Sequence, residues 1–291
     1  MSDALAIDAK EASKLTKEEW REWTTTMWSI PNNSHSDHPA VFPREIPHRL
    51  VKMFSFVGET VLDPFAGTGT TAVAANAVGR DAVLYEQNPQ FADVARAEIA
   101  KAALGGISAG GETRVEVGDS RDMSALEDGE VSLIVTSPPY WDKADYGGGR
   151  SDLGAIESYH HFLAEMKEVW AECFRVLRPG RKICIVTANV SQHTNHGLLM
   201  FPLAADFLAG ARDVGFLPVA EIIWNKHGTG GKWGSGGAQR PIFGSYPYPP
   251  NLLFKTVHEH IIVLSKPGLG KTTGPKVRSY ERLTSPLEIA E

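Results

Sequence analysis

Apolar residues along the chain follow two different periods. Short, largely apolar runs such as residues 131–136 are typical of strands buried on both faces of a sheet. Longer segments such as residues 156–180 repeat their apolar positions every three to four residues, as amphipathic helices do. Residues 30–47, rich in Pro, Asn and His, predict a loop. The pattern predicts strands at 59–67, 81–87, 113–120, 131–139, 181–190, 216–226 and 258–266, and helices at 16–23, 48–55, 69–79, 89–104, 156–180 and 201–215.

The order of these elements indicates an α/β fold. Strands that alternate with helices are typical of a doubly wound, Rossmann-like and mostly parallel sheet, here with seven predicted strands. The last two predicted strands follow one another without a helix between them. We therefore expect the last strand to be antiparallel and to lie at an edge of the sheet.

Composition fits a globular protein and excludes several classes. Hydrophobic residues make up 42% of the 291 residues and charged residues 22%. No apolar run approaches the roughly 18 residues of a membrane span, and the first residues lack the basic and apolar regions of a signal peptide. The two cysteines, Cys173 and Cys184, are far apart, which argues against a zinc site or a disulfide framework. A cytoplasmic protein without membrane contact is the expectation.

Charge is distributed unevenly along the chain. The formal net charge of −6 argues against a protein that coats nucleic acid without specificity. Residues 226–258, however, contain no Asp or Glu, and loops as long as residues 225–257 are usually functional or disordered. A solvated loop is the plainer interpretation, but aromatic residues among basic ones are unlike a linker. The residues of interest are Lys226, Lys232, Trp233, Arg240, Tyr246 and Lys255.

A glycine-rich turn follows the first predicted strand of the sheet. In a doubly wound sheet, ligands bind where such strands end, and Gly67 and Gly69 allow the backbone to approach a ligand closely. Glu86 ends the next strand, where an acid can bind both ribose hydroxyls of a nucleoside cofactor. Asp63 suits a cationic, amino-bearing ligand such as S-adenosylmethionine, if its carboxylate points into the pocket. The structural alternative is a tight turn between a strand and a helix.

A third acid follows the predicted strand at 113–120, on the same edge of the sheet. Asp119 lies in the sequence "GDS". Its carboxylate could accept a hydrogen bond from an adenine amino group, whereas the alternative is an aspartate that only stabilises a turn.

The strand at 131–139 ends in the rigid sequence Ser137-Pro138-Pro139-Tyr140. The two prolines have no N–H group and a fixed φ, so they end the strand and leave the Pro138 carbonyl free to accept a hydrogen bond. Ser137 adds a hydroxyl, and Tyr140 adds a flat face. This corner suits a planar ring that carries an exocyclic amino group. A turn stopped by proline is the structural alternative.

Together these stretches resemble the amino-methyltransferases that modify exocyclic amines of DNA bases. "DPFAGTGTT" at 63–71 is similar to their cofactor motif, and "TSPPY" at 136–140 is similar to their catalytic motif. The resemblance spans residues 28–266 and also covers "HPAVFP", "IIWNK" and "HEHIIVLSK". The Ser form of the catalytic motif is most typical of cytosine-N4 enzymes, and the Asp or Asn form of adenine-N6 enzymes.

The resemblance implies a methyltransferase fold, S-adenosylmethionine as the cofactor and a set of site residues. Residues 38–43 would close over the methionine end of the cofactor. The implied catalytic residues are Ser137, Pro138, Pro139 and Tyr140, and the implied cofactor-binding residues are Phe42, Pro43, Asp63, Phe65, Gly67, Thr68, Gly69, Thr70, Glu86 and Asp119.

The order of the two motifs differs from that in most enzymes of this type, in which the catalytic motif comes first. The position of the target-recognition region therefore does not carry over, and we assign it to the acid-free segment from its residues. The glycine-rich residues 141–152 are expected to form a mobile loop over the base pocket. The expected organisation is an N-terminal arm at 1–37, a catalytic core at 38–226, a target-recognition insertion at 227–257, the last core strand at 258–267 and a C-terminal tail at 268–291.

The resemblance implies a site-specific DNA cytosine-N4 methyltransferase that attacks in line on a flipped base. It would act on duplex DNA, either alone or beside a separate cognate restriction endonuclease, as a monomer or a dimer. Adenine N6 is the nearest alternative, and RNA or a protein amide is another substrate class. A non-catalytic DNA-binding regulator is disfavoured by the intact motifs. Methylation at cytosine carbon 5 needs a cysteine nucleophile, but Cys173 and Cys184 lie within predicted elements of the core.

Overall fold

The most apolar runs of the chain form the parallel part of one sheet. The computed structural model describes residues 8–31, 43–141, 152–226, 254, 256–268, 278 and 280. Every residue of β5 (Val131–Thr136) is buried, in keeping with its apolar sequence. The parallel neighbours are β2 (Thr60–Asp63), β3 (Asp81–Glu86), β4 (Thr113–Val117), β5 (Val131–Thr136) and β6 (Leu177–Thr187).

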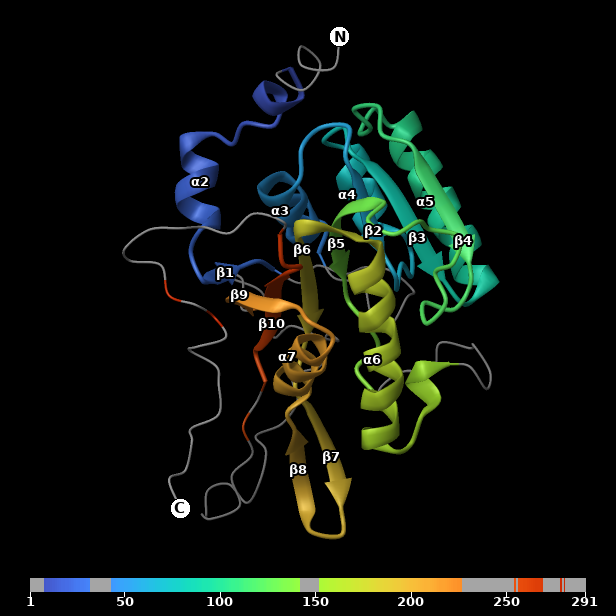
Figure 1. Ribbon diagram of the computed structural model, residues 1–291, viewed down its shortest axis with the longest axis vertical. Coiled ribbons are helices and arrows are strands. Elements are labelled where there is room, and N and C mark those ends of the chain that lie inside the picture. Colours follow the sequence, from blue (N-terminus) through green and yellow to red (C-terminus); the bar gives the residue numbers. More distant parts are fainter. Residues whose placement is uncertain are drawn as a thin grey trace.

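The order of the strands creates a switch point between β2 and β5. The eight-stranded sheet has the order β1-β9-β10-β6-β5-β2-β3-β4 (Figure 1). From β2 the chain proceeds through β3 and β4 toward one edge, and from β5 through β6 toward the other. The segments that follow β2 and β5 therefore start at the carboxyl ends of adjacent strands, which is where doubly wound sheets bind their ligands.

The last strand is antiparallel, as the sequence predicts, but the prediction of an edge position is wrong. β10 (His258–Ser265) lies between β6 and β9 (Leu217–Asn225) and is antiparallel to both. The edge is taken by β1 (Met27–Ser29), which pairs in parallel with β9. β1 was not predicted because three residues are too few to show a period.

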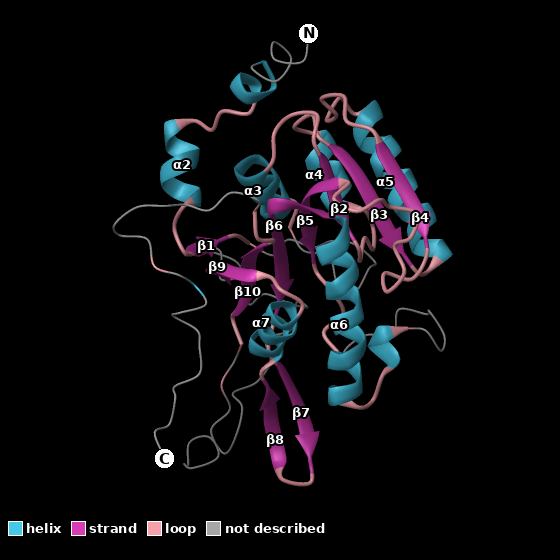
Figure 2. Ribbon diagram, in the orientation of Figure 1, coloured by secondary structure: helices cyan, strands magenta, loops and turns pink. Residues whose placement is uncertain are grey.

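Helices cover both faces of the sheet (Figures 1 and 2) and define two cores. On one face, Ile134 and Ile185 pack with residues of α6 and α7 such as Trp170 and Phe207. On the other face, Val135 packs with residues of α3, α4 and α5. Side chains alternate across a strand, so each strand serves both cores. The helices are α2 (Lys17–Trp23), α3 (Glu45–Phe54), α4 (Thr70–Asn76), α5 (Pro89–Leu104), α6 (Tyr159–Val176) and α7 (Leu203–Asp213).

Most predicted elements form, with shifts at their ends. The helix predicted at 156–180 is α6 and stops at Val176, because Leu177 is already extended and pairs with Val131 of β5. Of the loop predicted at 30–47, residues 32–42 lie outside the described part of the chain, and residues 45–47 belong to α3, which begins at Glu45. A projecting hairpin of β7 (Val190–Thr194) and β8 (Gly197–Phe201) and a 3₁₀ helix, η2 (Leu153–Ala155), were not predicted. None of the described helices is long and apolar enough to cross a membrane.

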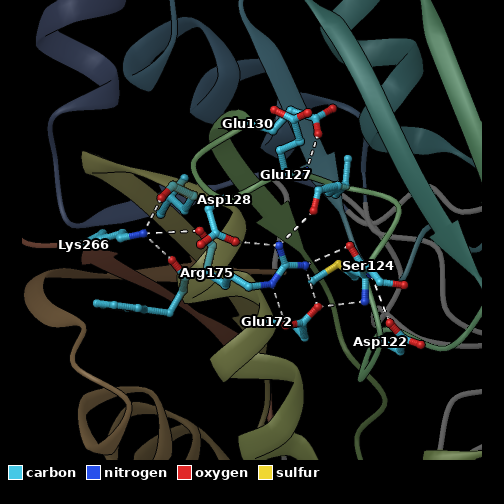
Figure 3. A network of polar contacts seen from close by, with 12 residues as sticks. Asp122, Ser124, Glu127, Asp128, Glu130, Glu172, Arg175 and Lys266 are labelled. Carbon is cyan, nitrogen blue, oxygen red and sulfur yellow. Dashed lines mark hydrogen bonds and ion pairs between the residues drawn. The ribbon is translucent and has the colours of Figure 1, made fainter.

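Arg175, in the last turn of α6, joins this helix to the connection between β4 and β5 (Figure 3). Its guanidinium makes two 2.8 Å bonds to the carboxylate of Glu172 and a 2.9 Å bond to Asp128. It also donates to the backbone carbonyls of Met123 and Leu126 at 2.9 and 2.8 Å. A planar group with five N–H donors can satisfy all these acceptors at once, which lysine cannot do.

We expect Arg175→Met to lower the free energy of unfolding by about 2–3 kcal/mol, because Glu172 keeps the N–H of Met123 but loses its guanidinium partner, and two backbone carbonyls lose the same donor. Lys101→Met is the control, since Lys101 forms only an exposed 3.3 Å pair with Glu98 and should change stability by less than about 0.5 kcal/mol. Urea titration of both variants measures the difference. Equal effects would contradict the role of the Arg175 network.

Candidate active site

The glycine loop and the Ser-Pro-Pro-Tyr corner meet at the switch point of the sheet. The loop follows β2, and the corner follows β5, the strand that pairs with β2. The two segments are linked directly, because Asp63 at the end of β2 accepts a 2.8 Å hydrogen bond from the hydroxyl of Thr136 at the end of β5. Thr136 precedes Ser137, so the position of one motif fixes that of the other.

Asp63 holds together three elements. Its Oδ1 accepts bonds from Thr136 and from the backbone N–H of Phe65, the latter at 3.0 Å, and its Oδ2 accepts a 2.6 Å bond from Thr71 of α4. The residue is 1% exposed. The expectation that this carboxylate points into an open pocket is therefore corrected: Asp63 faces the protein, where it positions the loop.

Burial raises the pKa of Asp63 to about 6, although the bonds from Thr71, Phe65 and Thr136 lower it in part. None of the three donors carries a charge, so hydrogen bonds alone offset the cost of removing the carboxylate from water. The negative charge at this position is thus less stable than that of an ordinary aspartate.

Glu86, at the end of β3, faces the glycine loop. Its Oε2 accepts a 2.8 Å bond from the N–H of Gly67, and its Oε1 accepts a 2.9 Å bond from the N–H of Asn88. The side chain is half-buried, and desolvation raises its pKa despite these two bonds. Glu86 thus lies at the glycine turn with its carboxylate orientation fixed, and the binding of a ribose there stays a prediction.

The turn between β2 and α4 requires glycine at Gly69. Gly69 has φ +80° and precedes the first residue of α4, Thr70. A Cβ atom there would lie 3.1 Å from the Cβ of Ala95 in α5. Phe65, Gly67, Thr68 and Thr70 are half-buried along the same turn.

Asp119, in the turn after β4, is engaged by an arginine. Arg121 donates to its Oδ1 from the backbone N–H at 2.9 Å and from Nε at 3.0 Å, and the same guanidinium also pairs with Glu165 of α6. Burial alone would raise the pKa of Asp119, but the bonds from Arg121 lower it below the ordinary value. This observation supports the turn-forming interpretation of Asp119, and contact with an adenine amino group stays a prediction.

At the Ser-Pro-Pro-Tyr corner the polar groups form a chain. Pro138 is buried, whereas Ser137, Pro139 and Tyr140 are half-buried. The Ser137 Oγ lies 3.2 Å from the Tyr140 hydroxyl, which donates a 3.0 Å bond to Oε2 of Glu259. The other oxygen of Glu259 pairs with Nζ of Lys226.

Glu259 is the site residue that sequence reasoning missed. It is 7% exposed and lies 119 residues beyond Tyr140. The motif "HEHIIVLSK" contains it, but the sequence alone assigns no role to its acid. The antiparallel direction of β10 brings it to the corner. His260 pairs with Thr187, the last residue of β6, so Glu259 emerges at the carboxyl edge of the parallel strands.

Trp141 continues the corner into the core. It is the one non-glycine residue among those described with positive φ, 54°, and its indole N–H donates a 2.9 Å bond to the carbonyl of Ile156. Its ring packs on Tyr159 and Phe201, with centroids 5.0 and 4.8 Å away. Trp141 is therefore a buried anchor rather than part of a loop over the base pocket.

The remaining predicted residues divide into those that the structure describes and those that lie outside the described part of the chain. Among the predicted DNA-binding residues, Lys226 is described, and its ammonium lies against Glu259 and 5.0 Å from the centroid of the Trp224 ring. Pro43 is half-buried just before α3. Cys173 and Cys184 are buried free thiols, and burial raises the pKa of both. Outside the described residues lie Phe42, Lys232, Trp233, Arg240, Tyr246, Lys255 and residues 142–151.

Comparison with known proteins identifies relatives of this chain. The sequence profile of the N6/N4 DNA methylase family matches residues 2–97 and 131–284. The chain is 47% identical over 81 residues to the Type II methyltransferase M.MjaI of Methanocaldococcus jannaschii and 40% identical over 91 residues to the Type II methyltransferase M.BglI of Bacillus subtilis. These segments cover 26% and 31% of this chain. The match spans about a quarter of each relative, 26% in both cases.

Among solved structures, the fold is shared with a SAM-dependent methyltransferase from Methanosarcina mazei. The TM-score is 0.50, and the match covers 75% of this chain and 97% of that chain. At 12% sequence identity, this likeness concerns the fold alone.

We expect Asp63→Asn to remove a pH dependence of stability that the wild type carries. An acid with a folded pKa of about 6, against 3.8 when unperturbed, stabilises the fold fully below about pH 4. That contribution is lost as the pH rises through 6, by roughly 3 kcal/mol. Asn resembles the protonated acid, so the stability of the wild type relative to the variant should fall between about pH 4 and pH 7. Denaturant titrations of the wild type and the variant at about pH 4 and pH 7 measure this change. The same stability difference between the two proteins at both pH values would refute the prediction.

We expect Gly69→Ala to destabilise the protein more than Gly58→Ala. The two glycines have nearly equal φ, +80° and +79°, but a Cβ at Gly58 would meet nothing within 4 Å. The left-handed conformation alone should cost about 1 kcal/mol in each variant, and the contact with Ala95 should add about 1–2 kcal/mol at Gly69. Chemical denaturation of the pair measures the excess. Equal losses of stability in the two variants would mean that α5 shifts away from the added methyl group at no cost in free energy.

Proposed function

The chain belongs to the N6/N4 DNA methylase family, and we propose that it transfers a methyl group from S-adenosylmethionine to the N4 amino group of cytosine in duplex DNA. The observation that carries this proposal is the bonding of Asp63 to both Phe65 in the glycine loop and Thr136 beside Ser137. The carboxylate of Asp63 thereby holds the glycine loop, which would bind the methyl donor, against the Ser-Pro-Pro-Tyr corner, which suits a ring that carries an amino group.

The residues at the end of β2 and β3 fit S-adenosylmethionine. Glu86 is half-buried with its orientation fixed by Gly67 and Asn88, as a carboxylate that binds the two ribose hydroxyls would need to be. Its neighbour Gly67 has no side chain to obstruct a nucleoside. When bound, S-adenosylmethionine supplies an electrophilic methyl carbon on a sulfonium sulfur.

The corner after β5 orients the amine that attacks. The lone pair of a cytosine N4 amine is conjugated with the ring, so the amine is a weak nucleophile. Bonds from its two N–H groups to Ser137 Oγ and to the Pro138 carbonyl favour a more tetrahedral nitrogen. Attack of the nitrogen on the methyl carbon would form the new carbon–nitrogen bond as the carbon–sulfur bond breaks and leaves its electron pair on sulfur. The amine would release one proton to solvent, and positioning would account for most of the rate.

The serine of the corner favours cytosine N4 over adenine N6. Ser137 is half-buried with its hydroxyl 3.2 Å from that of Tyr140, and a serine at the start of this motif is typical of enzymes that methylate cytosine N4. The family includes N6 and N4 enzymes, so adenine N6 is the second candidate. In either case the base must leave the duplex to reach the corner, at a cost of about a few kcal/mol.

The relatives M.MjaI and M.BglI are Type II methyltransferases, which supports a modification enzyme. We propose that it acts in the cytoplasm on a specific DNA sequence. We propose that residues 227–257 contribute to target recognition and that a cognate restriction endonuclease, where one exists, acts separately. A non-catalytic regulator is the alternative of another class. The assembled corner and loop favour an enzyme over a regulator, which would need neither.

The test is incubation of the purified protein with S-adenosylmethionine and mixed-sequence duplex DNA, followed by digestion to nucleosides and mass spectrometry. We expect N4-methyldeoxycytidine from the wild type and at least about a 100-fold lower rate from Ser137→Ala, because the loss of a bond made to the reacting amine acts on the chemical step.

Ser132→Ala is the matched control. Ser132 lies on β5, which ends one residue before Ser137. It is fully buried and has a hydroxyl without a partner among the described residues, so its loss should leave the rate within about two-fold. N6-methyldeoxyadenosine as the product would show that the target is adenine N6 rather than cytosine N4. Cofactor binding without any methylated nucleoside would favour the regulator.

A further inference from the structure

The hydroxyl groups of Ser137 and Tyr140 belong to a chain of hydrogen bonds that ends at the ion pair of Glu259 and Lys226. Ser137 Oγ and Tyr140 Oη are 3.2 Å apart, and either atom could donate the proton between them. Tyr140 Oη is also 3.0 Å from Oε2 of Glu259, and Oε1 of Glu259 pairs with the ammonium of Lys226. The distances alone leave the direction of the first bond open, whereas the chemistry of the last two residues determines it.

The proton count along this chain allows one direction. An ionised carboxylate only accepts hydrogen bonds, and a tyrosine hydroxyl has one proton to donate. Glu259 is 7% exposed and has a lysine as its partner, so it is present as the carboxylate of an ion pair. Tyr140 must therefore donate its proton to Glu259 and can only accept from Ser137.

This direction determines what Ser137 presents to a substrate. Its own proton points toward Tyr140, so the lone pairs of Oγ remain free for a hydrogen bond from outside the chain. The exocyclic amine of a base carries N–H donors and needs an acceptor. With the opposite direction, Ser137 would present its own O–H donor to the donor of the amine.

We infer that Glu259 is a positioning residue that makes Ser137 a hydrogen-bond acceptor toward the target amine. Glu259 acts through Tyr140, and Lys226 keeps it in the acceptor state. This inference rests on the proposed transfer to an exocyclic amine, but it holds equally for cytosine N4 and adenine N6.

Lys226 accordingly has a second use besides any contact with DNA. Its ammonium pairs with Glu259 and lies 5.0 Å from the centroid of the Trp224 ring, on the strand next to β10. A group held in this way has a fixed donor direction toward Oε1. A residue at position 259 must therefore point an acceptor atom at the ammonium of Lys226. The other atom at the end of its side chain then faces the hydroxyl of Tyr140.

Glu259→Gln uses this constraint to reverse the chain without a change in shape. Lys226 donates to the amide oxygen, so the amide NH₂ faces Tyr140 and donates to it. The proton of Tyr140 then turns to Ser137, and Ser137 presents a donor to the substrate. We expect kcat for methyl transfer to fall about 10- to 100-fold, the effect of one charge-assisted bond, with KM for S-adenosylmethionine within about two-fold.

Two second-site variants separate this role from a general loss of structure. In a Tyr140→Phe background the chain is already broken, so Glu259→Gln should lower kcat by less than about two-fold further. Lys226→Met added to Glu259→Gln frees the amide to rotate, so its oxygen can again accept from Tyr140. The double variant should recover at least about five-fold in kcat over Glu259→Gln alone.

The control is Glu221→Gln on the neighbouring strand β9, where Glu221 is largely exposed and pairs with His260 at 2.6 Å. Its kcat should stay within about two-fold of the wild type. Single-turnover and steady-state rates of methyl transfer to duplex DNA, with thermal melts of each variant, provide all the readouts.

The expected pattern is a lowered kcat for Glu259→Gln, recovery in the double variant with Lys226→Met and no further loss in the Tyr140→Phe background. A wild-type kcat for Glu259→Gln, or equal losses with and without the Tyr140 hydroxyl, would overturn the positioning role while the proposed function stands. A wild type that methylates no base amine would overturn the proposed function, and the inference with it.

Discussion

The structure of the site depends on the burial of one carboxylate, that of Asp63. Three neutral donors from the glycine loop, α4 and β5 converge on it, so the loop, the helix and the strand cannot shift independently. Desolvation raises its pKa to about 6, which means that the interior accepts the charge at a cost. The hydrogen bonds from the three donors offset that cost in part, and they also position two segments that come from opposite sides of the switch point.

Two kinds of interaction hold the carboxylates of Asp63, Glu86, Asp119 and Glu259 at this edge of the sheet. Asp63 is stabilised by hydrogen bonds alone, and Glu86 by two backbone N–H groups while half-buried. Asp119 is paired with Arg121, and Glu259 with Lys226. Because each acid has its own compensation, the edge can carry several negative groups close together. Asp63 and Glu86 have no cationic partner in the described part of the chain, and burial raises the pKa of both.

The antiparallel direction of β10 brings two further charged residues to the site. In a fully parallel sheet the first residues of this strand would emerge at the amino edge, far from the Ser-Pro-Pro-Tyr corner. Because β10 runs against β6 and β9, Glu259 emerges beside the end of β6, and Lys226 after the end of β9 lies next to it. The reversed strand therefore brings an acid and a base to the corner formed by the parallel strands. Tyr140 connects the two sets of residues.

The sequence by itself determined the class of fold and the two motifs, because these depend on local periods and on residues adjacent in the chain. Apolar runs such as residues 131–136 identify strands, glycines identify the tight turn before α4, and two prolines identify the corner after β5. The tertiary structure alone decided how Asp63 is oriented, that β10 is internal, and that Glu259 reaches Tyr140 across 119 residues. Orientation, strand order and long-range contact follow from packing between distant segments, and no local pattern encodes them.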